Sequence, residues 1–373
     1  MKPYVLQKLP LKEVNWELLI PLIGKANRAI AYYDGVLNGV PDPAILLSPL
    51  TTQEGVLSSK MEGTQATLGE VLKFEAGEEQ KQESKKLDIN EILNYRKALY
   101  HAEEELKTRP FSLNLLKELH DILLDSVRGR DKGRGQFRTT QNYIGRLGTP
   151  IEQADFVPPD PMFLIEHLDN WEKYYHADRP DPLVQLAIVH AQFEIIHPFN
   201  DGNGRLGRIL VPIFLYEKKL LSRPMFYLSG YFEEHRDEYI SRLRAIGKED
   251  DAWDQWIRFF LKAIDEQSHA NADKAQSIMA LYKGLKARVI ELTHSRYAVP
   301  ILDQMFERPI FTSAQLVFSS DAKPGRATIT NFFRPLIKAG ILDVAMEGSG
   351  RRPRILVLSE LMDICESKKT PLR

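Results

Sequence analysis

The sequence contains a single cysteine, Cys365, and no long run of hydrophobic residues. One thiol excludes an intramolecular disulfide and any metal site built from clustered cysteines. No segment approaches the length of a membrane span, and the N-terminus lacks the apolar core of a signal peptide. Neither sign of charge prevails, because 50 lysine and arginine residues face 51 aspartate and glutamate residues. We therefore expect a cytoplasmic protein that is not associated with a membrane and is not basic throughout.

The chain has the length and composition of an ordinary globular protein. Its 373 residues are 43% hydrophobic and 27% charged, which is enough for two or three units with a sizeable core. Apolar residues recur at helical spacing over most of the chain, which predicts a mainly α fold. The clearest predicted helices are 14–35, 58–75, 87–106, 112–127, 161–176, 182–196, 232–246 and 252–292. Glycine, threonine and aromatic residues instead fill 129–162, which predicts a short hairpin and loop.

The segment 197–208, HPFNDGNGRLGR, lies between two predicted helices. Glycines in a loop that opens a helix let backbone N–H groups point at an anion, and the helix dipole favours negative charge there. Arg205 and Arg208 share a helix face, which suits a polyphosphate. Asp201 offers a hard oxygen ligand for Mg²⁺, and His197 is the group able to accept a proton near neutral pH. The segment therefore predicts a phosphate site with a base beside it.

Two other interpretations of this segment are less favourable. It could be a helix–turn–helix corner with a capping aspartate and solvated arginines, but so many chemical groups within twelve residues argue against that. Gly202, Gly204 and Gly207 also match the dinucleotide-binding fingerprint. That fingerprint has meaning only between a strand and a helix, and here a helix precedes it.

The same segment resembles the signature of the Fic (Fido) family, HxFx(D/E)GNGRxxR, with every fixed position filled. Ser58-x-x-x-Glu62-Gly63 resembles the inhibitory pattern (S/T)xxxE(G/N) of family members with an N-terminal inhibitory helix. Residues 141–157 resemble the family's flap. The resemblance implies a Fic-type helical bundle with a short β-hairpin flap, followed by a small winged-helix domain. The predicted division is an N-terminal helical region 1–86, a catalytic core 87–292 and a winged helix 296–373.

The resemblance implies transfer of AMP from ATP to a hydroxyl of a protein tyrosine, serine or threonine, with release of diphosphate. Attack by a hydroxyl benefits from a base, the role assigned to His197. Asp201 would hold Mg²⁺, and Gly202 to Gly204, with the Asn203 side chain, would form an anion hole. The predicted nucleotide-binding residues are Gly202, Asn203, Gly204, Arg205, Leu206, Gly207 and Arg208, with Tyr239 near adenine by resemblance.

By the same resemblance, Glu62 would pair with Arg208 and deny the γ-phosphate its cation, and Ser58 belongs to this inhibitory pattern. In some relatives the same glutamate supports removal of AMP, so the reverse reaction stays open. The flap, 141–157, could pair main chain to main chain with an extended segment of a target protein. Self-modification and homodimer formation are also left open.

The C-terminal segment predicts a helix over 300–306, two more at 312–319 and 327–340, and then a hairpin around the basic turn 348–354. This order is typical of a winged helix. Residues 296–373 carry 12 basic and 8 acidic residues, a small excess beside dedicated DNA-binding domains. DNA binding and protein interaction both stay open. The alternative to an enzyme is therefore a nucleotide-sensing, DNA-binding regulator.

Overall fold

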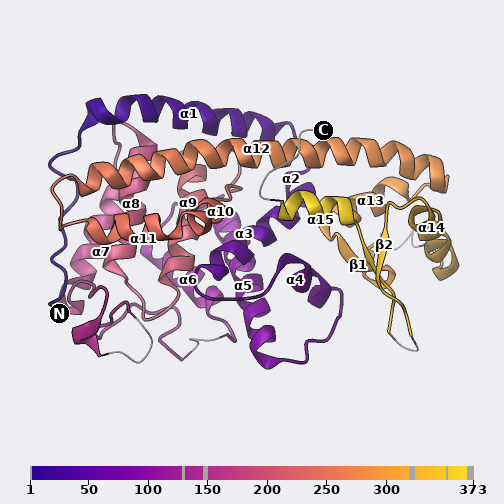
Figure 1. Ribbon diagram of the computed structural model, residues 1–373, viewed down its shortest axis with the longest axis horizontal. Helices are drawn as coiled ribbons and strands as arrows, with labels where there is room; N and C mark the ends of the chain where they lie inside the picture. Colours follow the sequence, from indigo (N-terminus) through magenta and orange to yellow (C-terminus); the bar gives the residue numbers. More distant parts are fainter. Residues whose placement is uncertain (1, 128–130, 146–149, 319–323, 350–351, 368–373) are drawn as a thin grey trace. The chain divides into compact units, whose positions relative to one another are not determined.

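The computed structural model of the chain describes residues 2–127, 131–145, 150–318, 324–349 and 352–367 (Figure 1). Helices dominate, and the mainly α fold that the sequence predicts is confirmed. Contacts group the chain into two compact units, each described here by itself. The first comprises Met1–Asp34, Leu57–Thr64 and Leu93–His269, and the second comprises Gly35–Val56, Gln65–Ile92 and Ala270–Arg373.

These units do not follow the boundaries predicted at residues 86 and 296, because several long helices contribute to both units. They include α1 (Trp16–Asn38), α5 (Glu83–Glu105) and α12 (Ala252–Thr293). A composition shift along the chain marks where sequence character changes. It does not mark the residue at which a helix leaves the contacts of one unit and enters those of the other. The three-part division therefore stays a prediction.

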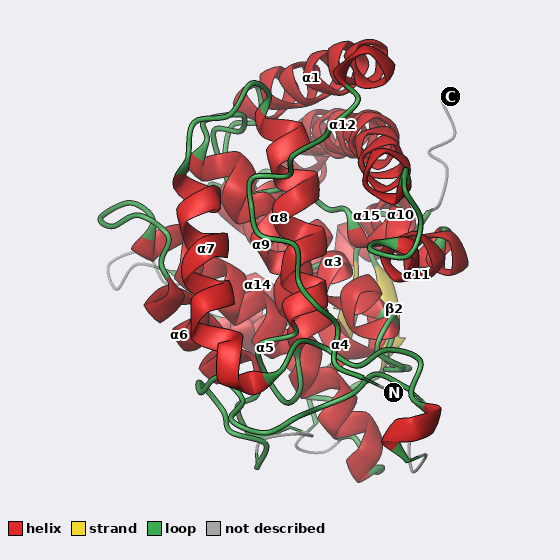
Figure 2. Cartoon of the chain, turned by 90° about the vertical axis from the view of Figure 1, so that its left-hand side faces the viewer, coloured by secondary structure: helices red, strands yellow, loops and turns green. Residues whose placement is uncertain are grey.

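The first unit is built around α8 (Pro182–Ile196) and α9 (Asn203–Glu217). These helices contact each other, α7 (Leu164–His176) contacts α8, and α6 (Leu113–Leu123) contacts α9 (Figure 2). The Asp181 carboxylate caps α8, and every α8 residue from Leu183 onward except Glu194 is buried. A helix that is apolar on all sides belongs in a core. The segment 197–208 therefore starts and ends inside the unit.

An aromatic cluster packs against the other side of α8. It is formed by residues from α10 (Ser229–Glu234), α11 (Arg236–Ala245) and the start of α12. Trp256 is fully buried, and its Nε1–H donates to the Ala187 carbonyl at 2.8 Å. The His190 ring stacks on Trp256 with 6.0 Å between ring centroids. His190 is thus a packed helix residue, as its isolation in the sequence suggests.

The helix predicted over 58–75 is two separate helices, α3 (Ser48–Lys60) and α4 (Leu68–Glu75). After α3 the Glu62 N–H donates to the Ser59 carbonyl at 2.9 Å, and Gly63 adopts φ 98°, which only glycine accepts readily. The helix therefore ends between the two residues of the predicted inhibitory pattern. A capping box at Thr67 then starts α4.

The non-helical segment 129–162 contains less β-structure than the predicted hairpin. In its described residues, Ile144 and Phe156 form one antiparallel bridge, with the Ile144 N–H donating to the Phe156 carbonyl at 2.8 Å. Short 3-10 helices follow at Ile151–Gln153 and Pro161–Phe163. Residues 146–149 of the predicted flap lie outside the described residues.

The C-terminal part of the second unit combines a three-stranded antiparallel sheet with helices. The strand order is β1-β3-β2, and Val357 of β3 pairs with Ile310 on one side and Asp343 on the other. The elements are α13 (Ala298–Glu307), β1 (Ile310–Thr312), α14 (Arg326–Lys338), β2 (Asp343–Met346), β3 (Ile355–Val357) and α15 (Ser359–Glu366). Of the helix predicted at 312–319, the described residues form only the 3-10 turn Ser313–Gln315. The winged-helix assignment stays a prediction.

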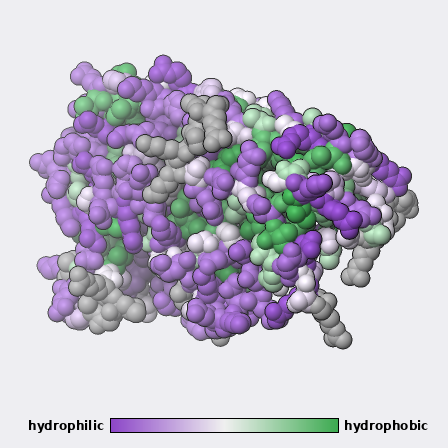
Figure 3. Space-filling view, turned by 45° about the vertical axis from the view of Figure 1, so that its right-hand side comes forward, coloured by the Kyte–Doolittle hydropathy of each residue, from purple (hydrophilic) through white to green (hydrophobic). Residues whose placement is uncertain are grey.

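The remaining short helix, α2 (Pro43–Leu46), contacts α13, and α4 contacts β1, both within the second unit. Figure 3 shows that hydrophilic side chains cover most of the visible face, with hydrophobic ones gathered in separate patches. Within the described residues, no helix has both the length and the apolar character that crossing a membrane requires.

The aromatic cluster predicts a large stability effect at Trp256. We expect Trp256→Ala to lower the free energy of unfolding by about 3–5 kcal/mol, because it removes a fully buried ring and leaves a cavity. Trp16→Ala is the matched control, since that side chain is 37% exposed and the loss should be clearly smaller. Urea unfolding followed by circular dichroism measures both, and equal losses would contradict this account of the core.

Candidate active site

The site is organised around the end of α8. His197 terminates the helix in the left-handed conformation, with φ 50° and ψ 59°, and its N–H donates to the Phe193 carbonyl at 3.0 Å. For a residue with a Cβ, this conformation costs about 1–2 kcal/mol. The backbone turn points the chain away from the α8 axis and brings the His197 ring to the side of α9. Surrounding contacts must therefore hold His197 in place.

Arg138 supplies these contacts, and sequence reasoning missed it. This residue is 2% exposed, and its guanidinium donates to the carbonyls of His197 at 3.0 Å, Ile196 at 3.3 Å and Pro159 at 2.5 Å. Its backbone N–H donates to the Pro198 carbonyl at 2.9 Å. The last carbonyls of a helix have no partner within it, so Arg138 satisfies buried acceptors that would otherwise be costly. No pattern in the sequence marks this role, because the acceptors are backbone groups up to 59 residues away.

The His197 ring is suited to accept a proton. Its Nδ1 lies 3.3 Å from the Glu194 carbonyl oxygen, which can only accept, so Nδ1 carries the hydrogen and Nε2 carries the lone pair. Burial lowers the pKa of His197 to about 4; the hydrogen bond to Glu194 opposes this shift and the Arg138 charge adds to it. The ring is therefore neutral at pH 7, with a free lone pair on Nε2.

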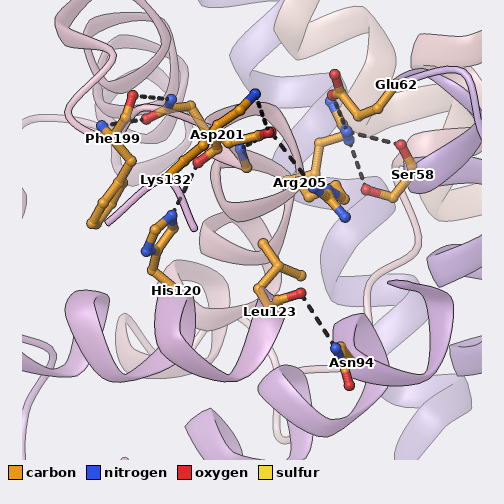
Figure 4. A network of polar contacts seen from close by, with 12 residues as sticks. Ser58, Glu62, Asn94, His120, Leu123, Lys132, Phe199, Asp201 and Arg205 are labelled. Carbon is orange, nitrogen blue, oxygen red and sulfur yellow. Dashed lines mark hydrogen bonds and ion pairs between the residues drawn. The ribbon is translucent and has the colours of Figure 1, made fainter. Parts of the chain in front are cut away.

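Asn203 closes the loop that follows His197. Its side-chain oxygen accepts from the Phe199 N–H at 2.9 Å, and its side-chain nitrogen donates to the Phe199 carbonyl at 2.8 Å (Figure 4). Gly202 adopts φ 76°, the left-handed conformation that glycine accepts without strain. Both polar atoms of the Asn203 side chain are thus engaged inside the loop. The predicted part of that side chain in an anion hole stays a prediction, as does binding of an anion by the backbone N–H groups.

His120 supports the same loop from α6, a role that no pattern in the sequence indicates. Its Nε2 lies 3.0 Å from the Asp201 carbonyl, and its Nδ1 accepts from the Gly135 N–H at 2.9 Å. Its ring stacks on the Phe199 ring with 3.8 Å between centroids. Burial lowers the pKa of His120 to about 4, so the ring is neutral and Nε2 is the donor to Asp201.

The first turn of α9 forms the anion cradle. Leu206 makes the first hydrogen bond to Gly202, at 3.1 Å, so the N–H groups of Asn203 and Gly204 precede any acceptor within the helix. A Cβ on Gly204 would lie 2.3 Å from Oε1 of Glu62. The Glu62 carboxylate therefore rests directly against the cradle, where an anionic ligand would bind.

Arg208 holds this carboxylate in place. Its Nη2 lies 2.6 Å from Oε1 of Glu62, its Nε donates to the Ser58 hydroxyl at 2.8 Å, and Nη2 also donates to the Ser58 carbonyl at 2.8 Å. The Arg208 side chain is 2% exposed and that of Glu62 is 40% exposed. Burial raises the pKa of Glu62, but the charge and hydrogen bond of Arg208, together with the Arg205 charge, outweigh it and hold the pKa below its usual value. Glu62 is thus ionised at neutral pH.

Asp201 lies at the opposite end of the cradle from Glu62. Its Oδ1 accepts from the Gly202 N–H at 2.7 Å and lies 3.9 Å from the Arg205 guanidinium, while Oδ2 lies 3.0 Å from Nζ of Lys132 (Figure 4). No group of three histidine, cysteine, aspartate or glutamate side chains able to hold a metal ion occurs among the described residues. One carboxylate fits Mg²⁺ that is held mainly by nucleotide phosphates and water.

A cleft of about 590 Å³ brings these residues together. His197, Asp201, Gly204, Arg208 and Glu62 all line it, with Ile144 and Phe156 of the flap bridge at one side. The cleft joins a neutral imidazole, an anion cradle, a carboxylate and a buried guanidinium. It can therefore bind a polyphosphate and take a proton from a group next to it.

Three of the predicted nucleotide contacts are closely packed against other helices, and their role in binding stays a prediction. Leu206 is fully buried, and Gly207 packs against α8, where a Cβ would lie 2.2 Å from Oε1 of Glu194. Both motif positions therefore contribute to helix packing. Tyr239 borders the cleft, but it is 5% exposed and its hydroxyl lies 3.0 Å from Nε2 of His190. Its ring packs in the aromatic cluster, so the contacts leave no open ring face for adenine.

Glu194 is a further residue of the cleft that sequence reasoning missed. Its Oε1 is buried and has no hydrogen-bond partner among the described residues. Burial raises the pKa of Glu194 to about 7, with Arg208 opposing the rise and Glu62 adding to it. The signal in the sequence is an acidic residue within the mostly apolar α8.

Comparison with known proteins agrees with this site. The Fic/DOC family N-terminal model matches residues 20–104 and the Fic/DOC family model matches residues 110–215. The chain belongs to the Fic family. A Fic family protein from Desulfovibrio desulfuricans G20 has a TM-score of 0.58 at 20% identity, with 96% of this chain and 98% of that chain covered. Fic-1 from Caenorhabditis elegans has a TM-score of 0.53 at 21% identity, with 71% and 75% covered. These structures share the fold.

Similar curated proteins are adenylyltransferases. Protein adenylyltransferase Fic of Aedes aegypti is 28% identical over 207 residues, which are 51% of this chain and 38% of that protein. The probable protein adenylyltransferase aq_aa38 of Aquifex aeolicus is 39% identical over 94 residues, 24% of this chain and 26% of that protein. The matched region thus spans less than half the length of these relatives.

The site geometry predicts how His197 titrates. We expect Arg138→Met to raise the pKa of His197, because it removes a nearby positive charge, while burial keeps the pKa below the usual value. The facing carboxylates, Glu62 and Asp201, are unchanged and also favour the protonated ring. An NMR titration of the ring protons measures this, with the signal assigned by its absence in His197→Ala.

Arg134→Met is the matched control, because Arg134 lies on the same loop region but pairs with Asp121 and Asp125. It should leave the His197 titration unchanged. An unaltered pKa in a folded Arg138→Met protein would contradict the assigned contact.

Proposed function

We propose that the protein is a protein adenylyltransferase that restrains its own activity through Glu62. It would transfer AMP from ATP to a tyrosine, serine or threonine hydroxyl of target proteins, and of itself. One observation carries the proposal: the Glu62 carboxylate lies on Arg208 and against Gly204, in the same cleft as a neutral His197. The names of the similar proteins support the reaction class.

The proton transfer follows from the His197 ring. The target hydroxyl would attack the α-phosphorus, and Nε2 of His197 would accept its proton. A pKa of about 4 keeps Nε2 free of a proton before the reaction, because burial disfavours the charged ring. Arg138 acts through His197 by holding the backbone on which the ring stands.

The phosphates would lie along the start of α9. The N–H groups of Asn203 and Gly204 would bind phosphate oxygens, Arg205 would contact the α/β region, and Arg208 would bind the γ-phosphate. Asp201 would hold Mg²⁺, which supplies charge neutralisation to the leaving diphosphate when bound. All these groups lie on one loop and the first two turns of one helix, so they are preorganised before the nucleotide arrives.

The inhibition rests on competition for Arg208. A hydrogen bond to a charged group contributes about 1.5–3 kcal/mol, and the 40% exposure of the Glu62 side chain reduces that value through solvent screening. Such a contact is strong enough to exclude the γ-phosphate from Arg208 most of the time. It is also weak enough for movement of the end of α3 to release it. Ser58 strengthens the contact by holding the guanidinium from the other side.

The flap would present the target. Gln141 to Ile144 leads to the cleft, which Ile144 lines, and the Ile144–Phe156 bridge holds the end of this segment. Main-chain pairing with an extended target segment would place a hydroxyl near the α-phosphate without reading much sequence. Residues 146–149 of the flap lie outside the described residues.

Glu62→Gly should raise AMP transfer by about tenfold or more, since it frees Arg208 for the γ-phosphate. The measurement is incorporation of label from ATP labelled at the α-phosphate into the protein itself and into added proteins. ATP labelled at the γ-phosphate should give no incorporation, which separates AMP transfer from phosphorylation. The double variant Glu62→Gly/His197→Ala should give none with either nucleotide.

Glu79→Gly is the matched control, because Glu79 is an exposed residue of the loop after α4. It should label like the wild type. If Glu62→Gly and wild type are labelled equally, the inhibitory role of Glu62 is wrong. If neither is labelled although both bind ATP, the alternative of a nucleotide-sensing, DNA-binding regulator takes its place.

Removal of AMP is a second candidate activity, favoured by Glu62 facing the same cleft as His197. A half-exposed carboxylate there could position a water molecule against an AMP–protein bond. A labelled target incubated with wild type and with Glu62→Gly tests this. Release of AMP by wild type alone would support the second activity, and equal release would exclude a role for Glu62 in it.

A further inference from the structure

Lys132 is a cation at the site that the mechanism above does not use. It lies on the loop 132–135 between α6 and the flap, and its Nζ lies 3.0 Å from Oδ2 of Asp201. Figure 4 shows its side chain reaching across to the Asp201 carboxylate. The Lys132 side chain is 57% exposed and that of Asp201 is 31% exposed, so the ammonium can leave the carboxylate.

The loop that carries Lys132 is anchored at both ends. The Lys132 carbonyl accepts from the Asn200 side chain at 3.3 Å, and the Gly135 N–H donates to Nδ1 of His120 at 2.9 Å. Gly133 and Gly135 have φ of 78° and 67°, conformations in which other residues would be strained. The backbone is therefore built to present Lys132 beside the loop of Asp201.

Arg134, on the same loop, has a different role. It donates to both carboxylate oxygens of Asp121, at 2.7 and 2.9 Å, and to Asp125 at 2.5 Å. These contacts attach the loop to α6 and the turn after it, and they occupy the guanidinium. The ammonium of Lys132 faces the site, whereas the charge of Arg134 is neutralised by two carboxylates.

The ammonium is within reach of bound phosphates. If Asp201 held Mg²⁺, phosphate oxygens bound to the same ion would lie beside its carboxylate. Lys132 lies next to this carboxylate, with Nζ 3.0 Å from Oδ2. Its flexible four-carbon stem would let the ammonium move from Asp201 to a phosphate oxygen.

We propose that Lys132 is a catalytic cation that binds the leaving diphosphate; this inference rests on the proposed function. In the transfer, a bond forms between the target oxygen and the α-phosphorus, and the bond from the α-phosphorus to the bridging oxygen breaks. The electron pair of that bond leaves with diphosphate, and the hydroxyl proton goes to Nε2 of His197. The Lys132 ammonium takes no part in the proton transfer and neutralises charge that builds on the diphosphate.

The test measures binding without turnover, in the full-length Glu62→Gly/His197→Ala protein. Calorimetric titrations in the presence of Mg²⁺ measure the binding of ATP, AMP and inorganic diphosphate. The protein with Lys132 intact is compared with its Lys132→Met and Lys132→Arg variants. We expect Lys132→Met to weaken ATP and diphosphate binding about tenfold, the size of one partly screened charge contact, and to change AMP binding little. Lys132→Arg should keep most of the affinity.

Lys8→Met is the matched control, since Lys8 forms an exposed ion pair with Glu166 at 2.6 Å, apart from the cleft. It should change none of the affinities. Equal weakening for AMP and diphosphate, or no weakening, would overturn the proposal, as would Lys132→Arg behaving like Lys132→Met. Because no transfer is needed for these titrations, failure of the proposed function in the labelling assay is recognised separately.

In the active Glu62→Gly protein, Lys132→Met should also lower kcat for AMP transfer, with circular dichroism confirming an unchanged fold. An unaltered kcat together with weaker diphosphate binding would overturn the catalytic role.

Discussion

The active-site geometry depends on how α8 ends. Two buried helices, α8 and α9, are joined by only six residues, so the backbone must reverse where water cannot satisfy its polar groups. Arg138 bonds the carbonyls around His197, and the Asn203 side chain bonds both polar groups of Phe199. With these acceptors and donors satisfied, His197 can hold a left-handed conformation. The positions of the imidazole, of Asp201 and of the anion cradle all follow from this corner.

Burial at this corner also determines the charges of the site. The same desolvation that lowers the pKa of His197 raises that of Glu194, so a neutral base and a carboxyl that titrates near pH 7 share one cleft. Two groups that are proposed to bind the nucleotide and its metal, Arg208 and Asp201, form ion pairs with side chains of the protein itself. Glu62 lies on Arg208, and Lys132 lies on Asp201. Under the proposed function, a nucleotide with its metal would displace both contacts, and the side chains of Glu62 and Lys132 are partly exposed.

The sequence predicted the helical fold and the segment 197–208 well, because helical periodicity and a glycine-rich helix start are local properties. It also placed Ser58 and Glu62 in one pattern, and both contact Arg208. It missed the break after α3, since capping at Thr67 competes with a continuous helix. It also treated all of 202–208 as ligand contacts. Residues of a motif can be required for packing as well as for binding, and Leu206 and Gly207 contribute to packing.

The sequence by itself determined which chemical groups are present and that a base, a carboxylate and two arginines lie within one helix turn of a glycine loop. Only the tertiary structure decided which of these groups face the cleft and what else meets them there. Arg138, His120, Glu194 and Lys132 carry no recognisable spacing relative to that loop. The first two and Lys132 contact backbone carbonyls, a ring and a carboxylate at the end of α8 and in the loop after it, and Glu194 lines the same cleft. Such contacts depend on how α6, α8 and α9 pack, and packing is a property of the folded chain.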